Sequence, residues 1–484
     1  MSQILQTKEG LVSICTSVRC LPLQFRVVLA SFLQTPGVPF ADSLSEETIE
    51  AAFQEEGVTF AQGEDEVYTP AVTLWAFLSQ MLFKEEQRSC AAAVARVIVM
   101  LVSLGRKPCS DNTGAYCRAR AKLSEPALRR LVYHVADRCE DAVPDAWRWK
   151  SRRVGLVDGF TVSMPDTPDN QEAYPQPASQ QEGLGAPLMR GVVLLSLATA
   201  MARGLAVGPC IGKETGETAL LRELFDRFRP GDVMLADRYF CSYFMICQLK
   251  ERRVDVVSRL HQRRTADFRR GKRLGPGDHL VRWMRPPRPE WMDEATYERM
   301  PASLEVREVE VAVPQPGFRP DVLVVVTTLL DAGEYSRNDL AELYHQRWLA
   351  ELDIRAIKCS MGMDVLRCKS AAMVRKETWT HLLAYNLVRR TLLQSALECG
   401  RCPRQISFTA ALQKIAASWT QGPSLDDETT AILLQTYSQH LFGHRVGHRP
   451  NRVEPRAVKR RPKPHALLTK PRDEARAALL AGKV

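Results

Sequence analysis

The stretches Val154-Gly155-Leu156-Val157-Asp158 and Val233-Met234-Leu235-Ala236-Asp237 are two apolar runs that each end on an aspartate. Short, uninterrupted apolar runs are typical of strands buried in the middle of a sheet. In α/β sheets, functional side chains gather at the strand ends, where the apolar sheet stops and a crevice opens. We therefore expect Asp158 and Asp237 at the ends of two core strands.

The segments between these two runs indicate the fold class. Two further strands are expected at 187–199 and 204–211, with a turn near 202–204, and an amphipathic helix follows at 217–228. Three strands, a helix and a fourth strand are the opening of a ribonuclease H-like fold. We therefore predict an α/β ribonuclease H-like core built on a mixed sheet.

A β-rich insertion is expected after the second aspartate. A helix at 242–252 and a strand at 254–260 lead into a loop-rich stretch, 262–302, which is strongly basic at its start. Residues 305–313 alternate between apolar and charged side chains, which predicts a half-buried strand. Residues 322–329 form a fully apolar strand that closes the insertion.

Helical segments surround this core. Six segments before residue 148 carry apolar side chains at helical spacing: 21–34, 47–55, 74–82, 91–104, 112–123 and 125–139. Basic residues on the last two fit either a unit that reads DNA ends or a packing domain with solvated charges. We divide the chain into an all-helical N-terminal domain at 1–148, core halves at 149–258 and 336–395, the insertion at 259–335, C-terminal helices at 396–440 and a basic tail at 441–484.

The composition is that of an ordinary globular protein. Of the 484 residues, 45% are hydrophobic and 25% are charged, which excludes collagen-like, coiled-coil and wholly disordered classes. We find no export signal at 1–26 and no apolar run long enough to span a bilayer, so we expect a cytoplasmic protein with no membrane partner. The 13 Cys fit small buried hydrophobes, and the single pair Cys399 and Cys402 is weak evidence for zinc.

The positive charge is concentrated near the C-terminus. The chain carries a net charge of +10, and the segment 443–472 alone holds ten basic residues, one acid and five prolines. Such a segment cannot form a packed core, and an extended cationic chain binds along phosphates and releases counterions. The alternative is a solvated tail that keeps the protein soluble.

A helix expected at 336–360 carries an unusual charged face. Ser336 with Asp339 resembles a capping box at its start. At about 100° per residue, Tyr344, Arg347, Glu351 and Lys358 share one face about 60° wide, and Arg355 joins that face. One acid among several cations and a tyrosine suits a metal beside a DNA phosphate. The alternative, a solvated helix face, does not explain the apolar residues that flank this stripe.

Two aspartates at strand ends and a glutamate on a later helix make a divalent-metal site. Mg²⁺ prefers carboxylates and water and keeps positions free for phosphate oxygens. Two such ions about 4 Å apart can activate an attacking oxygen and stabilise a leaving oxygen. Asp158, Asp237 and Glu351 are therefore the candidate metal ligands.

The spacing Tyr344-x2-Arg347-x3-Glu351-x6-Lys358 resembles the Y-R-E-K signature of the insertion-sequence-four family of bacterial DDE transposases. Further similarity to the family lies in Asp158-Gly159-Phe160, in 236–240, in 326–329, in 366–370 and in the tail at 451–463. The similarity extends over roughly residues 150–470 and is weaker in the N-terminal region.

The resemblance implies a cut-and-paste DNA transposase. Water would attack first to free a 3′-OH at the element ends, and this 3′-OH would then attack target DNA. Asp158, Asp237 and Glu351 would be catalytic and would hold two Mg²⁺ or Mn²⁺ ions. The partners would be double-stranded DNA, both terminal inverted repeats and target, and a second copy of the chain in a homodimeric synaptic complex on the bacterial nucleoid. The DNA-binding side chains would be Tyr344, Arg347, Lys358, Arg355 and Arg238, with Arg456, Lys459, Arg460, Arg461 and Lys463 of the tail.

Two other functions stay open at this point. A ribonuclease H-fold nuclease without strand transfer would share the metal site, and an inactive or domesticated DNA-binding regulator would share the DNA-binding residues. The presence of all three acids favours an active enzyme. Some hairpin-forming relatives stack a flipped base on a Trp of the insertion. Here Trp283 and Trp291 lie in the loop-rich stretch and the strand at 322–329 has no Trp, so a hairpin intermediate is not assigned.

Overall fold

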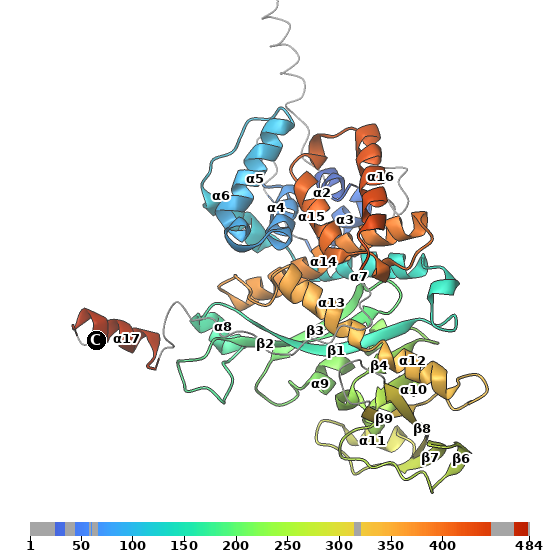
Figure 1. The fold of residues 1–484 in the computed structure, drawn as a ribbon. Coiled ribbons are helices and arrows are strands. Elements are labelled where there is room, and N and C mark those ends of the chain that lie inside the picture. The colour runs from blue at the N-terminus through green and yellow to red at the C-terminus, as the bar shows by residue number, and fades with distance from the viewer. Residues whose placement is uncertain are drawn as a thin grey trace, which may run out of the picture.

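A mixed β-sheet lies at the centre of the molecule, with helices on both of its faces (Figure 1). The computed structural model describes residues 25–33, 44–57, 60, 66–313, 321–446 and 469–482. Within these residues the sheet has nine strands in the order β3-β2-β1-β4-β5-β9-β8-β7-β6. The strands are β1 (Val154–Ser163), β2 (Leu188–Ser196), β3 (Ala202–Pro209), β4 (Val233–Ala236), β5 (Asp255–Arg259), β6 (Lys272–Gly275), β7 (Asp278–Met284), β8 (Ser303–Val313) and β9 (Asp321–Thr327).

The first five strands have the ribonuclease H-like arrangement. β1, β2 and β3 form an antiparallel meander, and β4 and β5 add to β1 in parallel. The prediction of a mixed sheet is confirmed, and β4 ends at Ala236, directly before Asp237. The prediction that the first core strand ends at Asp158 is wrong, because β1 stays paired with β2 as far as Ser163 and Asp158 lies in its middle. The strands of the insertion extend the same sheet, because β9 pairs antiparallel with β5 and β8 pairs with β9.

The insertion holds more regular structure than its sequence predicts. The stretch expected to be loop-rich contains β6, β7 and the helix α11 (Glu294–Arg299), so Trp283 lies on a strand and not in a loop. Two of the charged residues of β8, Arg307 and Glu308, are buried, whereas Glu305 is exposed. Arg307 is buried in an ion pair with Asp278, and Glu308 accepts hydrogen bonds from Trp283 and bonds His279. These pairs satisfy the polar groups that a covered strand buries.

Two boundaries near the core also differ from prediction. The turn between β2 and β3 occupies residues 197–201, before the predicted position, because the Ser196 and Thr199 hydroxyls accept from main-chain N–H groups there and Ala200 takes a positive φ of 62°. The next helix, α9 (Glu217–Arg222), is shorter than predicted and continues as a 3₁₀ turn, Phe225–Arg227. α10 (Tyr243–Glu251) follows β4 as expected.

Helices from both ends of the chain pack together over one face of the sheet (Figure 1). A continuous apolar core joins Trp75 of the N-terminal helices, Leu387 of α14 and Leu156 of β1. The helical predictions before residue 148 are confirmed for the described residues, whereas the division into domains stays a prediction. These helices are α2 (Arg26–Ser31), α3 (Glu46–Gln54), α4 (Pro70–Leu82), α5 (Cys90–Ser103), α6 (Thr113–Lys122), α7 (Glu125–Asp141), α14 (Ala371–Glu398), α15 (Phe408–Ser418) and α16 (Asp427–Gly443).

The basic tail falls largely outside the described residues. Residues 447–468 are not described, and they include the five predicted DNA-binding side chains Arg456, Lys459, Arg460, Arg461 and Lys463. A short helix, α17 (Arg472–Leu480), follows them. Among the described helices, none combines the length and the apolar character needed to cross a bilayer.

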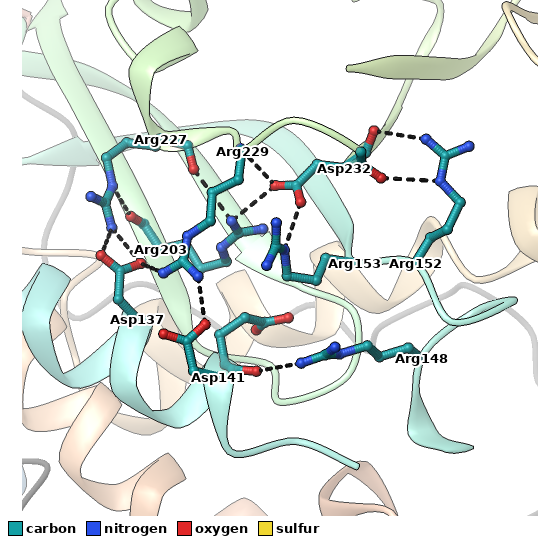
Figure 2. Close-up of polar contacts among 11 residues, drawn as sticks. Asp137, Asp141, Arg148, Arg152, Arg153, Arg203, Arg227, Arg229 and Asp232 are labelled. Carbon is teal, nitrogen blue, oxygen red and sulfur yellow. Dashed lines mark hydrogen bonds and ion pairs between the residues drawn. The ribbon is translucent and has the colours of Figure 1, made fainter. Parts of the chain in front are cut away.

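Ion pairs fasten the N-terminal ends of β1 and β4 (Figure 2). Asp232, which precedes β4, has a fully buried carboxylate that accepts from Arg153 at 2.7 Å and from Arg203 at 3.0 Å. Arg227 pairs with Asp137 of α7 at 2.8 Å and so ties the helical layer to the sheet. A buried carboxylate costs free energy unless it is paired and hydrogen-bonded, and Asp232 meets both conditions.

Candidate active site

β1 has an open edge inside the sheet where its neighbour β4 ends. The two strands are parallel neighbours, and the last residues in register are Val157 and Ala236. Asp158 and Asp237 each follow this pair directly, so their side chains lie next to each other. β4 ends at Ala236, whereas β1 continues to Ser163, so among the described residues β1 has no strand on this side beyond Val157. A crevice at such a strand end is where α/β sheets place their ligands.

Asp158 lies on β1 beside the end of β4. Its carboxylate is 21% exposed and accepts a hydrogen bond from the Gly159 N–H at 2.9 Å. Burial raises the pKa of Asp158 to about 6, and the charges of Glu351 and Asp237 add to this rise, while Arg347 and the Gly159 N–H oppose it. Burial therefore makes the charged form of Asp158 unfavourable in free energy, and a bound cation would offset this cost.

Asp237 is fixed at the start of a 3₁₀ turn, Arg238–Phe240. Its carboxylate accepts from the Arg238 N–H at 2.7 Å. Its main-chain oxygen accepts from the buried Ser258 hydroxyl of β5 at 2.9 Å. β5 thus holds the main chain of Asp237 in place, and the 3₁₀ turn that follows Asp237 holds its side chain.

The single helix predicted at 336–360 is wrong, because the structure divides it. The capping box of Ser336 and Asp339 is confirmed at the start of α12 (Arg337–His345). A tight turn at 346–347 separates α12 from α13 (Trp348–Arg355), and a π-helical turn, Ala356–Ser360, follows. The constant step of about 100° per residue therefore does not hold from Tyr344 to Lys358.

Arg347 stands at this break and joins two of the acids. Its guanidinium donates to Glu351 at 2.6 Å and lies 3.5 Å from Asp158. Glu351 itself is half exposed, with 51% of its side chain accessible. One arginine thus balances a carboxylate on β1 and a carboxylate on α13, and it brings the helix to the end of the strand.

The remaining predicted residues are less closely gathered. Tyr344 is buried, and burial together with the charge of Asp237 raises its pKa to about 12. Arg238 is half-buried and acts electrostatically on Tyr344. Arg355 is exposed and Lys358 is half-buried, and neither forms an ion pair with another described residue.

An anchor for α13 was missed by the sequence reasoning. Asp353, two residues after Glu351, is buried and accepts from Arg389 of α14 and from Arg404, each at 2.8 Å. Arg404 also donates to the main chain of Ser196 at the end of β2. This ion-pair cluster sets the position of α13 over the sheet, and no motif in the sequence marks it.

Glu217, at the start of α9, was also missed as a site residue. Its carboxylate lies directly over Gly159, the residue after Asp158 in β1. Burial and the charge of Asp237 raise the pKa of Glu217, and Arg190 opposes the rise. A lone Glu at the start of a helix gives no signal in a single sequence, because acids are common in a first helical turn.

The donor set at the crevice suits a hard divalent cation. Asp158 and Asp237 offer carboxylate oxygens side by side, which Mg²⁺ and Mn²⁺ prefer. In the described part of the chain, no three Cys, His, Asp or Glu side chains are closed into a ligand shell. The Glu351 oxygen binds the Arg347 guanidinium, whose positive charge lies between Glu351 and Asp158.

Comparisons with known proteins agree with this geometry. Residues 149–387 match the family model described as a transposase DDE domain. The chain is 26% identical over 383 residues to the transposase InsG for insertion sequence element IS4 of Escherichia coli, covering 78% of this chain and 81% of that protein. It is also similar to the piggyBac transposase in a synaptic complex with hairpin DNA, at 12% identity and a TM-score of 0.43, covering 86% of this chain and 85% of that one. That last similarity is too low to establish a shared fold.

Proposed function

Because the chain belongs to the IS4 family of DDE transposases, we propose that it moves its DNA element by cut-and-paste transposition. Its DNA transposase activity follows from the family match over residues 149–387 and from the relative that shares 26% of its sequence. The proposal adds the order of steps. Hydrolysis at the element ends frees a 3′-OH, and this 3′-OH then joins the ends to target DNA.

The adjacent carboxylates at the ends of β1 and β4 are the observation that supports this proposal most. Two ions of Mg²⁺ or Mn²⁺ would be held by Asp158, Asp237 and Glu351. When bound, the ions activate the attacking oxygen and stabilise the leaving oxygen. The raised pKa of Asp158, about 6, means that protons compete with the metal as the pH falls toward that value.

The chain's own residues would position the DNA. Arg347 neutralises Asp158 and Glu351 in the DNA-free protein, and we expect its guanidinium to turn to a phosphate once metal takes over that role. A guanidinium suits this exchange because it binds carboxylate and phosphate with the same bidentate geometry. Further phosphate contacts are proposed for Tyr344, Lys358, Arg355 and Arg238.

The proposed partners are the two inverted repeats, the target duplex and a second copy of the chain. Two ends must be held together for coupled cutting and joining, which a homodimer would provide. The basic tail, with Arg456, Lys459, Arg460, Arg461 and Lys463, would add contacts to the phosphate backbone that weaken with salt. The protein would act on the bacterial nucleoid.

A cleavage assay tests the proposal. The purified chain is mixed with labelled DNA that carries the element's own ends, with Mg²⁺ or with EDTA, beside Glu351→Ala. We expect metal-dependent release of a 3′-OH at the ends, lost in the variant, followed by joining to a second duplex. Binding to the ends without cleavage would exclude the enzymatic proposal, and cleavage without joining would reduce it to a nuclease.

A further inference from the structure

The active-site crevice can be reached from both faces of the sheet. Neighbouring residues of a strand direct their substituents to opposite faces. On β1, Leu156 packs in the core beneath α13 and α14, whereas Val157 packs in the second core with α9 and α10. Asp158 therefore faces the side of α13, and the Cα hydrogens of Gly159 face the side of α9.

Glu217 occupies the space over Gly159. A Cβ placed on Gly159 would lie 2.4 Å from the carboxyl carbon and from one oxygen of Glu217, and 2.8 Å from the other oxygen. Gly159 does not have a positive φ, so backbone conformation is not the reason for glycine here. The glycine instead leaves room for a carboxylate immediately beside Asp158.

The Glu217 carboxylate is half-buried and lacks its own counterion contact. Within the described residues it forms neither a hydrogen bond nor an ion pair. Arg190 is the opposing charge that acts on it, but one Arg190 nitrogen donates to the main-chain oxygen of Thr215 at 3.0 Å. The charge of Asp237 acts against ionisation of Glu217 as it does for Asp158. A partly buried carboxylate beside other carboxylates is costly unless a cation joins them.

We propose that Glu217 is a fourth metal ligand, which shares one of the two ions with Asp237 from the face opposite Glu351. The inference rests on the metal centre of the proposed function and adds a ligand to it. β4 ends at Ala236, so the edge of β1 beside Asp158 and Gly159 is open, and carboxylates from the two faces can meet there. Asp237 directly follows the end of β4 at this open edge, so it is the ligand that both faces share.

Mn²⁺ binding to the full-length, DNA-free protein tests this directly. Isothermal titration gives the affinity and the number of ions, and thermal unfolding with and without Mn²⁺ gives a second readout. Glu217→Gln keeps the size and removes the charge. The matched control is Glu223→Gln, an exposed glutamate at the C-terminal end of the same helix, and circular dichroism verifies that both variants fold.

We expect Glu217→Gln to weaken Mn²⁺ binding by about tenfold or more, or to abolish one of the two binding events, because loss even of an outer partner costs 10–100-fold in affinity. Its thermal stabilisation by Mn²⁺ should shrink in parallel, while Glu223→Gln behaves as wild type. Wild-type affinity and ion number in Glu217→Gln would overturn the inference.

Asp237→Asn separates this inference from the function on which it rests. If Asp237→Asn loses Mn²⁺ binding and Glu217→Gln does not, only the fourth ligand is wrong. If both variants bind Mn²⁺ as wild type does, the metal centre itself is misplaced and both proposals fail.

Gly159→Ala provides an independent check, because the new Cβ collides with the Glu217 carboxylate. It should weaken Mn²⁺ binding in the wild-type background and have no further effect in Glu217→Ala, where that space is empty. Equal and additive effects in the two backgrounds would show that Glu217 does not act through the space over Gly159.

Discussion

The two sides of the parallel pair β1 and β4 differ in how arginines balance their carboxylates. At the N-terminal ends, Asp232 is fully buried and paired with Arg153 and Arg203. At the carboxyl ends, Asp158 and Glu351 share a single guanidinium. Among the described residues, the Asp237 carboxylate there accepts a hydrogen bond only from a main-chain N–H.

Within one pair of strands, this difference distinguishes charges that stabilise the fold from charges that serve a function. At the first end the aspartates Asp137, Asp141 and Asp232 are each paired with at least one arginine (Figure 2). The second end leaves carboxylates in excess, and burial of Asp158 makes that excess costly. Groups with strongly shifted pKa values in a cleft are typical of functional sites.

Asp237→Asn should abolish cleavage and leave folding intact. Metal ligation contributes several kcal/mol of transition-state stabilisation, so the rate should fall roughly a thousandfold or more. Single-turnover cleavage with Mg²⁺ measures the loss, and urea unfolding in EDTA verifies that stability is retained. A variant that cuts at the wild-type rate would place the metal elsewhere.

Asp232→Asn should have the opposite profile. The change leaves Arg203, whose side chain is 0% exposed, without its buried carboxylate, and breaking such a pair costs about 3–5 kcal/mol. Urea unfolding measures this drop in the free energy of unfolding. A loss below about 1 kcal/mol, as for surface pairs, would contradict the structural role of this end.

Asp158→Asn should stabilise the metal-free protein at neutral pH. The folded-state pKa of Asp158 is raised from 3.8 to about 6, so its ionisation destabilises the fold progressively as the pH rises between these values. The variant should therefore gain up to about 3 kcal/mol above pH 6 and nothing below about pH 4. Unfolding in EDTA across this range measures the gain. A difference in the free energy of unfolding that does not change with pH would show that burial does not raise the pKa of Asp158.

Arg355→Ala should have the smallest effect. The side chain is exposed and forms no ion pair with a described residue, so stability should change by less than about 0.5 kcal/mol. If Arg355 binds a phosphate, DNA affinity should fall a fewfold and the salt slope should decrease by about one. An unchanged slope would remove Arg355 from the DNA interface.

Local sequence pattern predicts much of this fold because the core strands are continuous apolar runs. Val154 to Val157 and Val233 to Ala236 have no polar interruption, so both core strands and the end of β4 before Asp237 could be located from the sequence. The extension of β1 past Asp158 to Ser163 could not, because it depends on pairing with β2. The capping box at Ser336 likewise depends only on residues three apart.

The remaining features depend on contacts between distant segments. The break at 346–347 contains neither Gly nor Pro, and Arg347 there contacts Asp158, which lies 189 positions earlier in the chain. Asp353 is anchored by arginines 36 and 51 positions later. Glu217 meets Gly159 only because α9 folds back over β1. Such long-range contacts leave no periodic pattern in a single sequence.

Affinity cleavage by Fe²⁺ tests the central claim most directly. Fe²⁺ replaces Mg²⁺ in the protein, ascorbate and peroxide generate radicals at the bound ion, and mass spectrometry locates the broken peptide bonds. Asp232 and Asp237, which flank β4, are about 17 Å apart at the usual rise per residue, so cuts beside them are distinguishable. We predict cuts beside Asp158 and Asp237, none beside Asp232, and none at all in Asp237→Asn. Cuts at the N-terminal ends of the strands, or cuts that persist in Asp237→Asn, would contradict a metal centre at the carboxyl ends of β1 and β4.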